Sequence, residues 1–91
     1  MYRIEPDLDV LLGRVRRKYQ GNQRFISAVE EGLRILSETP RAFSHRIAKL
    51  PKGRYRYRHG RCRIIYRIDD DRMLVRILKI DLRSETTYED L

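Results

Sequence analysis

The sequence predicts an α+β fold in the order β-α-α-β-β-β, with an antiparallel sheet and an N-terminal helical hairpin packed on one face of it. Two observations predict this fold. The first part of the chain carries two segments with the apolar period of an α-helix, and the rest carries segments in which charged and apolar residues alternate. Because 91 residues bury only one small core, we interpret residues 1–91 as a single domain.

A brief strand and a first helix are predicted at the start of the chain. Residues 2–4 contain an aromatic and a β-branched residue and stop at Glu5-Pro6, which favours a short strand. Pro6 then opens a helix, and the basic residues crowded into its last turn complement the helix dipole. Its apolar positions share the i, i+3, i+4, i+7, i+11 spacing of one helix face, and they are Leu8, Leu11, Leu12, Val15 and Tyr19.

A second helix is predicted from the break at Gly21-Asn22 to about Glu38, where Thr39-Pro40 ends it. Gly32 lies within this helix and would allow close backbone approach. Two amphipathic helices with a very short connection form an antiparallel hairpin that needs a sheet to cover. The apolar side of the second helix consists of Phe25, Ile26, Val29, Leu33 and Leu36.

The predicted sheet follows the hairpin. Residues 41–50 are ambiguous, with a short helical turn containing Phe43 as one interpretation, and residues 50–53 are a clear break. Successive side chains of a strand point to opposite faces. In residues 54–59 the arginines should therefore lie on one face, and the tyrosines with His59 on the other. The strands are predicted at residues 54–59, 61–69 and 73–80, with turns at His59-Gly60 and at residues 69–72.

The distribution of charge indicates a polyanionic partner. The net charge is +8, and between residues 41 and 67 there are ten Lys or Arg and no Asp or Glu. A solvated surface is the ordinary interpretation of a charge run, but clustered cations without interspersed acids favour a bound polyanion such as nucleic acid. Membrane lipid is a weaker candidate, because the basic residues alternate along strands instead of lining one amphipathic helix.

Other classes of protein are disfavoured by the composition. No apolar run approaches the ~18 residues that cross a bilayer, and residues 1–6 lack the apolar segment of a signal peptide. The expected compartment is therefore the cytoplasm. The single cysteine, Cys62, cannot form an internal disulfide, and with His45 and His59 it does not make a zinc-ligand spacing. We expect no metal and no cofactor.

Residues 50–68, LPKGRYRYRHGRCRIIYRI, resemble the RelE/ParE toxin pattern L-x-G-x-x-(K/R)-x-(K/R)-x-G-x-(Y)-R-(I/L)-(I/V)-Y. Residues 75–80, VRILKI, followed by Arg83 and Tyr88, are similar to the final strand and the ending of the ribonuclease branch. The resemblance implies a RelE-like fold and a toxin of a type II toxin–antitoxin system, with a cognate acidic antitoxin. For the RelE branch it implies a metal-independent endoribonuclease, an mRNA interferase, that cuts mRNA in the ribosomal A site and so inhibits translation.

The resemblance also implies the site residues. The reaction is attack by a ribose 2′-hydroxyl on the adjacent phosphate, and guanidinium groups suit the charge of its transition state. Arginine stays protonated, so where relatives carry lysine at these positions the identity of the base is left open. The implied catalytic residues are Arg56, Arg63, Arg83 and Tyr88, the implied RNA phosphate ligands are Arg54, Arg58 and Arg61, and a candidate acid or base is His59.

Several alternatives stay open at this point. His59 is also interpreted as a turn residue, and the tyrosines of residues 54–67 as packing residues instead of base-stacking ones. A ParE-like inhibitor of DNA gyrase shares the fold, as fold alone does not fix function. A non-catalytic module that binds RNA or the ribosome needs only the arginines. The presence of both Arg83 and Tyr88 favours RNA cleavage over the gyrase inhibitor.

Overall fold

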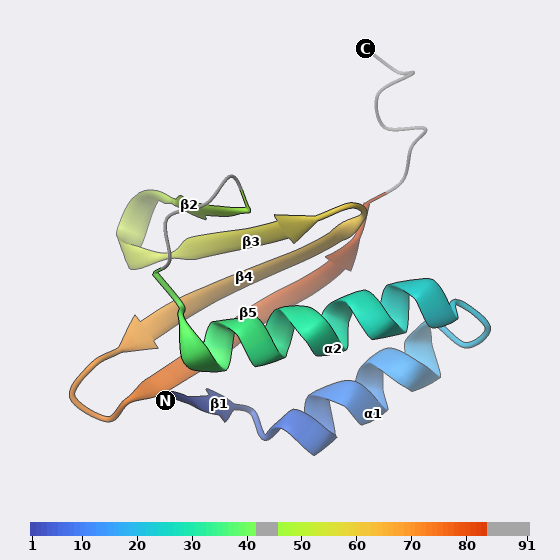
Figure 1. Ribbon diagram of the computed structural model, residues 1–91, viewed down its shortest axis with the longest axis horizontal. Coiled ribbons are helices and arrows are strands. Elements are labelled where there is room, and N and C mark those ends of the chain that lie inside the picture. The colour runs from blue at the N-terminus through green and yellow to red at the C-terminus, as the bar shows by residue number, and fades with distance from the viewer. Residues whose placement is uncertain (42–45, 84–91) are drawn as a thin grey trace, which may run out of the picture.

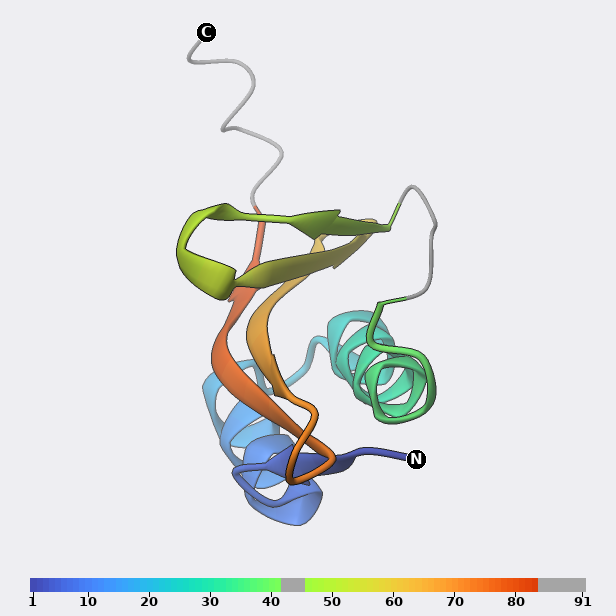
Figure 2. The same ribbon diagram turned by 90° about the vertical axis from the view of Figure 1, so that its left-hand side faces the viewer.

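The computed structural model describes residues 1–41 and 46–83 and confirms the predicted α+β fold. Two helices are followed by strands of a five-stranded sheet with the order β1-β5-β4-β3-β2 (Figure 1). Helices α1 and α2 run side by side, and α2 packs on strands of the sheet. Seen at right angles, the sheet twists strongly between its β2 edge and its β1 edge (Figure 2).

The two helices form as their apolar period predicts. Helix α1 is Leu8–Lys18 and helix α2 is Gln23–Glu38, where the side chain of Asn22 caps the first turn by accepting a hydrogen bond of 3.2 Å from the Phe25 N–H. All the predicted apolar positions of α2 are buried, and so are Leu11, Leu12 and Val15 of α1. Leu8 differs from the prediction, because it lies in the first turn of α1 and stays 37% exposed.

The sheet differs from the prediction in one added strand. Part of the segment that was ambiguous by sequence forms β2, Ile47–Lys49, which pairs antiparallel with β3; the predicted turn at Phe43 lies outside the described residues. The other strands are β1 Arg3–Glu5, β3 Tyr55–His59, β4 Cys62–Asp69 and β5 Leu74–Leu82. β1 pairs parallel with β5, so the sheet is antiparallel except at this edge.

Strand β5 runs past its predicted end and includes Asp81. The β4–β5 register shifts between Ile65 and Tyr66, as in a β-bulge. Beyond the shift, Asp81 is opposite Arg63. The longer strand thus brings beside the arginines an acidic residue that the sequence pattern put just after the strand.

The core lies between α2 and the inner face of the sheet, the face that carries Tyr57, Ile64 and Tyr66. The Tyr66 hydroxyl donates a buried hydrogen bond of 2.6 Å to the Pro40 carbonyl oxygen. Cys62 is a free, buried thiol, and burial raises its pKa to about 12. The predicted packing role of the tyrosines is confirmed for Tyr57 and Tyr66, because both side chains are almost fully buried.

Candidate functional site

The outer face of the sheet, opposite the helices, carries the predicted arginines. Strand alternation puts Arg56 and Arg58 of β3 and Arg63 of β4 on this face, since the residues between them, Tyr57 and Cys62 among others, are buried on the inner face. We name Arg56, Arg58 and Arg63, with Lys79 of β5, the arginine face. Cross-strand pairing holds these four side chains on three neighbouring strands.

The centre of the arginine face is a row of three residues in register. Arg58 of β3 is opposite Arg63 of β4, and Arg63 is opposite Asp81 of β5. Like charges that face each other across two strands repel, whereas opposite charges attract. Arg63 is therefore drawn toward β5, and its Nη2 donates a hydrogen bond of 2.8 Å to Asp81 Oδ2.

Asp81 is a charged carboxylate shared by two cations. Lys79 Nζ lies 3.5 Å from the same oxygen, Oδ2, that accepts from Arg63. Partial burial of Asp81 would raise its pKa, but the hydrogen bond from Arg63 and the charge of Lys79 outweigh burial and hold the pKa below its usual value. The run of ten basic residues without an acid, noted in the sequence, is thus partly neutralised by a residue from the next strand.

Two guanidinium nitrogens of the arginine face are buried without a hydrogen-bond partner among the described residues. They are Nε of Arg56 and Nε of Arg63. A buried donor that lacks an acceptor is costly, and most native structures supply one. Both nitrogens belong to residues that the sequence resemblance assigns to phosphate chemistry, and because each nitrogen is shielded from solvent, an oxyanion would reach it only after the guanidinium group moves.

Arg54, a predicted phosphate ligand, is engaged with its own turn. Its Nε donates a 3.1 Å hydrogen bond to the Pro51 carbonyl oxygen, at the start of the short 3₁₀ turn Pro51–Gly53. Arg67 Nη1 donates to the carbonyl oxygen of Lys52 in the same turn. Lys52 has a φ of 65°, an uncommon value for a residue other than glycine, and the two arginines hold this conformation in place.

His59 and Arg61 lie at the β3–β4 turn, next to α2. Strand alternation puts His59 with the tyrosines, as predicted, and both His59 and Arg61 line a pocket of about 460 Å³ between α2 and the β3–β4 turn. Its apolar part includes Phe25 and Leu82. The structure therefore does not bring His59 or Arg61 onto the arginine face with Arg56 and Arg63.

Arg83 closes the described part of the chain after β5. Its backbone N–H donates a 2.8 Å hydrogen bond to the Arg61 carbonyl oxygen, which continues the β4–β5 pairing beyond Leu82. It follows Asp81 by two residues, the spacing of one strand face. The other predicted catalytic residue at this end, Tyr88, lies outside the described residues.

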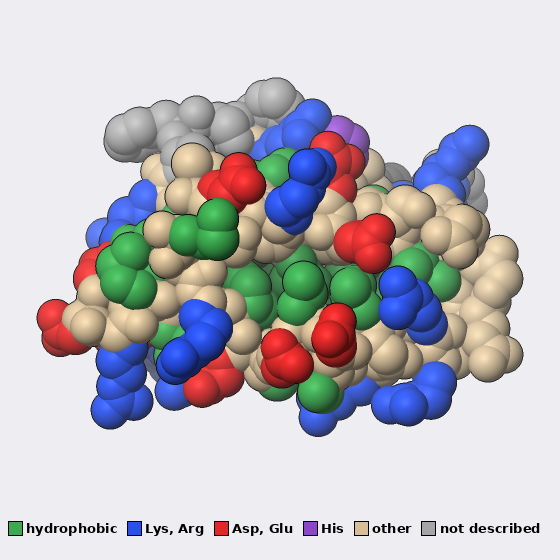
Figure 3. Space-filling view, turned by 60° about the horizontal axis from the view of Figure 1, so that its bottom comes forward, with side chains coloured by type: hydrophobic (Ala, Val, Ile, Leu, Met, Phe, Trp, Pro, Cys, Tyr) green, Lys and Arg blue, Asp and Glu red, His purple; other side chains and the backbone are tan. Residues whose placement is uncertain are grey.

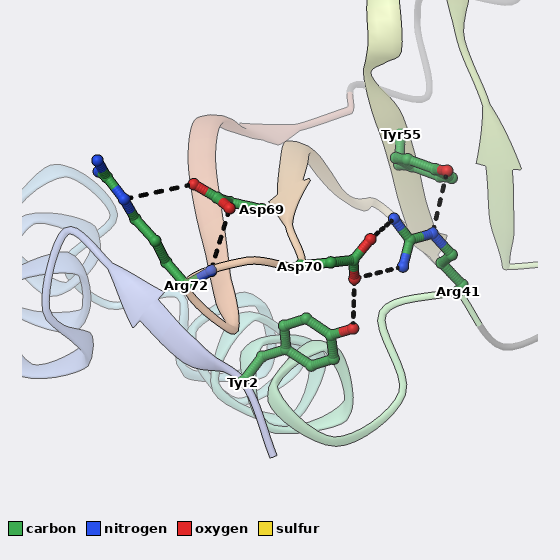
Figure 4. Close-up of polar contacts among 6 residues, drawn as sticks. All are labelled: Tyr2, Arg41, Tyr55, Asp69, Asp70 and Arg72. Carbon is green, nitrogen blue, oxygen red and sulfur yellow. Dashed lines mark hydrogen bonds and ion pairs between the residues drawn. The ribbon is translucent and has the colours of Figure 1, made fainter.

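A second polar cluster was not foreseen from the sequence, which indicated only a turn at residues 69–72. Asp70 in that turn accepts hydrogen bonds from both terminal nitrogens of Arg41, at 2.8 and 2.7 Å, and from the Tyr2 hydroxyl at 2.7 Å (Figure 4). Arg41 Nε also donates to the Tyr55 hydroxyl at 3.3 Å. The hydrogen bonds from Arg41 and then Tyr2 lower the pKa of Asp70 to about 2.

This cluster has a structural role. It ties together the N-terminus, the segment after α2, β3 and the β4–β5 turn (Figure 4). Arg41 belongs to the basic run of the sequence, yet its charge is matched by Asp70 and does not add to the arginine face. A long-range partner of this kind has no signal in the local sequence pattern.

The hairpin carries a groove between α1 and α2 whose lining is partly apolar and partly charged. Its volume is about 750 Å³, and Ile4, Leu12 and Leu33 contribute apolar lining while Glu30 and Arg34 contribute charged lining. Figure 3 shows apolar side chains gathered on this side of the molecule between acidic and basic ones. The groove is on the helical layer, away from the arginine face.

The described part of the chain carries neither a metal-binding cluster nor a membrane-spanning helix. Among residues 1–41 and 46–83, no three His, Cys, Asp or Glu side chains lie close enough together to hold a metal ion. Within those ranges no helix is both long and apolar enough to cross a bilayer.

Comparison with known proteins gives one family and two similar structures. The family described as the ParE toxin of type II toxin–antitoxin systems, parDE, matches residues 2–86. The toxin–antitoxin complex RelBE2 of Mycobacterium tuberculosis contains a chain with 28% identity and a TM-score of 0.62, matched over 91% of the present chain and 96% of that one. The isolated E. coli RelE toxin shares the fold at 21% identity and a TM-score of 0.64, over 99% and 95% of the two chains. No curated protein sequence gave a match.

Proposed function

The chain belongs to the RelE/ParE family of type II toxins, and from this premise we propose that it is a RelE-like endoribonuclease that cleaves mRNA in the ribosomal A site. The observation that carries the proposal is the pair of buried, unpartnered Nε atoms of Arg56 and Arg63 on one face of the sheet, within the described residues. Two guanidinium groups with unused donors suit a phosphodiester, whose oxygens accept hydrogen bonds in pairs. The similarity to the M. tuberculosis chain of the RelBE2 complex supports the RelE branch.

The proposed reaction needs three things from the protein. It must hold the 2′-hydroxyl in line with the phosphorus, stabilise a phosphorane that carries more negative charge than the substrate, and move two protons. In this proposal Arg63 and Arg56 bind the non-bridging oxygens of the scissile phosphate. Arg83 completes the phosphate site and stabilises the leaving oxygen as a permanently charged hydrogen-bond donor, and Tyr88 positions or deprotonates the 2′-hydroxyl.

Binding of the rest of the RNA is proposed for the flanking cations. Arg58 is exposed on the arginine face and its side chain has no partner among the described residues, so it is suited to a neighbouring phosphate. Arg54 and Arg61 remain proposed RNA ligands outside the centre of the face. Their described contacts with the turn and the pocket favour positioning of the backbone over chemistry. The proposal gives His59 no part in proton transfer, because it is on the inner side of the sheet with the tyrosines.

An acidic antitoxin is proposed as the partner. The net charge of +8 favours an acidic chain that neutralises the arginine face, and the groove between α1 and α2, with its mixed apolar and charged lining, suits an amphipathic segment of such a chain. The M. tuberculosis relative was solved as a toxin–antitoxin complex. Ribosomes and mRNA as targets imply action in the cytoplasm.

A gyrase-directed toxin is the second candidate, because the matching family is described by the ParE toxin of parDE systems. Two assays on the same purified protein separate the candidates. Single-turnover cleavage of mRNA on programmed ribosomes should be positive, and inhibition of DNA gyrase supercoiling should be absent. The opposite result would replace the proposal with the ParE-like function. Binding to ribosomes without either activity would leave a non-catalytic RNA-binding module.

A further inference from the structure

We propose that Asp81 competes with the RNA phosphate for Arg63. In the free protein the Asp81 carboxylate is paired with both Arg63 and Lys79, and when a phosphate binds Arg63 it stays paired with Lys79 alone. The inference rests on the proposed function and adds to it a residue that sets the affinity for RNA. Three observations support it: the nitrogen atom of Arg63 that Asp81 contacts, the exposure of the Arg63–Asp81 pair, and the position of Lys79.

Asp81 engages the nitrogen that a phosphate needs most. A guanidinium group can bind two phosphate oxygens side by side through Nη2 with Nη1, or through Nη2 with Nε. Both arrangements use Nη2, and Asp81 Oδ2 lies 2.8 Å from Nη2 of Arg63. The Nε that would complete one of the two arrangements is buried and has no partner among the described residues. Nη2 carries two N–H groups, so the carboxylate competes with a phosphate for the N–H that it occupies, and the phosphate arrangement that uses this N–H requires the carboxylate to move away.

The pair is exposed enough to open. The side chains of Arg63 and Asp81 are 38% and 24% exposed, so solvent reaches the contact and screens it. The repulsion from Arg58, opposite Arg63 on the other neighbouring strand, persists while only Asp81 is present. A phosphate that bound between Arg58 and Arg63 would relieve this repulsion. Asp81 does not, because it lies on β5, on the side of Arg63 away from Arg58.

Lys79 keeps Asp81 paired after Arg63 is released. Its Nζ is 3.5 Å from the same Oδ2, and its side chain is 63% exposed and able to adjust. An uncompensated carboxylate on a phosphate-binding face would repel the ligand. Because Lys79 is adjacent, the Asp81 carboxylate loses Arg63 as a partner on RNA binding but keeps Lys79. Its negative charge therefore stays paired when RNA is bound.

The test compares two variants that raise the net charge by the same amount. Asp81→Asn removes the carboxylate on Arg63, and the control Glu5→Gln removes another carboxylate that is ion-paired to an arginine, Arg76, at 2.9 Å. The Glu5–Arg76 pair is on strands β1 and β5 and does not touch Arg63. The probe is a short single-stranded RNA with 2′-O-methyl groups, which cannot be cleaved, and binding is followed by fluorescence anisotropy.

Asp81→Asn should bind the probe about five-fold more tightly than the unmodified protein, the factor that corresponds to ~1 kcal/mol for an exposed ion pair. The slope of the logarithm of its affinity against the logarithm of the salt concentration should also be steeper, by up to ~0.7. In Asp81→Asn the free Arg63 has no carboxylate beside it, so RNA binding at Arg63 displaces a salt anion instead of an internal one. Glu5→Gln should show only a smaller effect from the general field. The gain should vanish in Arg63→Ala/Asp81→Asn when it is compared with Arg63→Ala.

Equal affinities for Asp81→Asn and Glu5→Gln, or a gain that survives the loss of Arg63, would overturn the inference while RNA binding itself stands. Weaker binding by Asp81→Asn would assign Asp81 a positioning role and would also overturn it. If Asp81→Asn unfolds, as judged by thermal denaturation, Asp81→Ser is measured in its place. Failure of the unmodified protein to bind the probe would also overturn the inference, whereas failure to cleave mRNA on programmed ribosomes would defeat the proposed function.

Discussion

Gly32 of α2 lies directly against the ring of Tyr57 on β3: a Cβ at Gly32 would come within 2.8 Å of Tyr57 Cε1 and 3.1 Å of Ile64 Cδ1. Both neighbours belong to the buried core, so neither can move away freely. This contact sets how closely α2 approaches the sheet, and through β3 and β4 it supports the strands that carry the arginine face on their other side.

Gly32→Ala should therefore lower the free energy of unfolding. Gly13→Ala is its matched control, because Gly13 is also inside a helix but has no atom within 4 Å of an added Cβ. Both substitutions gain helix propensity of about 1 kcal/mol, and only Gly32→Ala overpacks the core. The two variants should differ by about 1–3 kcal/mol in urea denaturation. Equal stabilities would show that the ring of Tyr57 relaxes without cost.

Tyr66→Phe should destabilise the fold by about 1–3 kcal/mol, because it leaves the buried Pro40 carbonyl oxygen without its donor. Tyr19→Phe serves as the control, since the Tyr19 ring packs on Phe25 but its hydroxyl makes no hydrogen bond within the described part of the chain. Chemical denaturation of both variants measures the difference. A loss in Tyr19→Phe as large as that in Tyr66→Phe would contradict the prediction.

Asp70→Asn should remove part of the acid sensitivity of the fold. The pKa of Asp70 is lowered from 3.8 to about 2 in the folded state, so its stabilisation is fully present above the unfolded value and is lost as the pH falls from about 4 through 2. The variant should be less stable than the unmodified protein at neutral pH, and the gap should close in this acid range. Denaturation curves at several pH values test this, with Asp71→Asn in the same turn as the control.

Arg63→Ala and Arg56→Ala should separate chemistry from binding. If each guanidinium acts as one oxyanion donor, its loss costs on the order of 10²–10³ in the single-turnover rate on programmed ribosomes, or about 2.7–4 kcal/mol. Ribosome binding should change little. Arg16→Ala is the control, because Arg16 is on α1 in an exposed pair with Glu30 and away from the arginine face. Unchanged rates in both arginine-face variants would remove the RelE-like assignment.

Tyr88→Phe tests the C-terminal tyrosine, whose role rests on family resemblance. The substitution keeps the ring and removes the hydroxyl, so a rate loss similar to that of Arg63→Ala would support positioning or proton transfer at the 2′-hydroxyl. The measurement is again the single-turnover rate on programmed ribosomes. An unchanged rate would limit Tyr88 to packing and would make another group the base.

Local sequence patterns were enough to predict most elements of this protein and the face that each side chain occupies. The helical period of Leu11, Leu12 and Val15 and the alternation of residues 54–59 depend only on local geometry, in which side chains repeat every 3.6 residues along a helix and every second residue along a strand. For the same reason alternation alone assigned the arginines and tyrosines to opposite faces of the sheet. Strand β2 was not predicted because Ile47–Lys49 has a single β-branched residue and no aromatic one, whereas the equally short β1 lies beside Tyr2 and is followed by Pro6.

Which charges meet was decided by the packing of whole elements. Asp81 is 18 residues from Arg63, and Asp70 is 29 residues from Arg41 and 68 from Tyr2. These partners follow from strand order and from the β4–β5 register shift, and no local pattern encodes either of them. The sequence therefore indicated a run of cations on one face, whereas in the folded chain Arg63 carries its own counterion, because a neighbouring strand places a carboxylate within hydrogen-bonding distance of it.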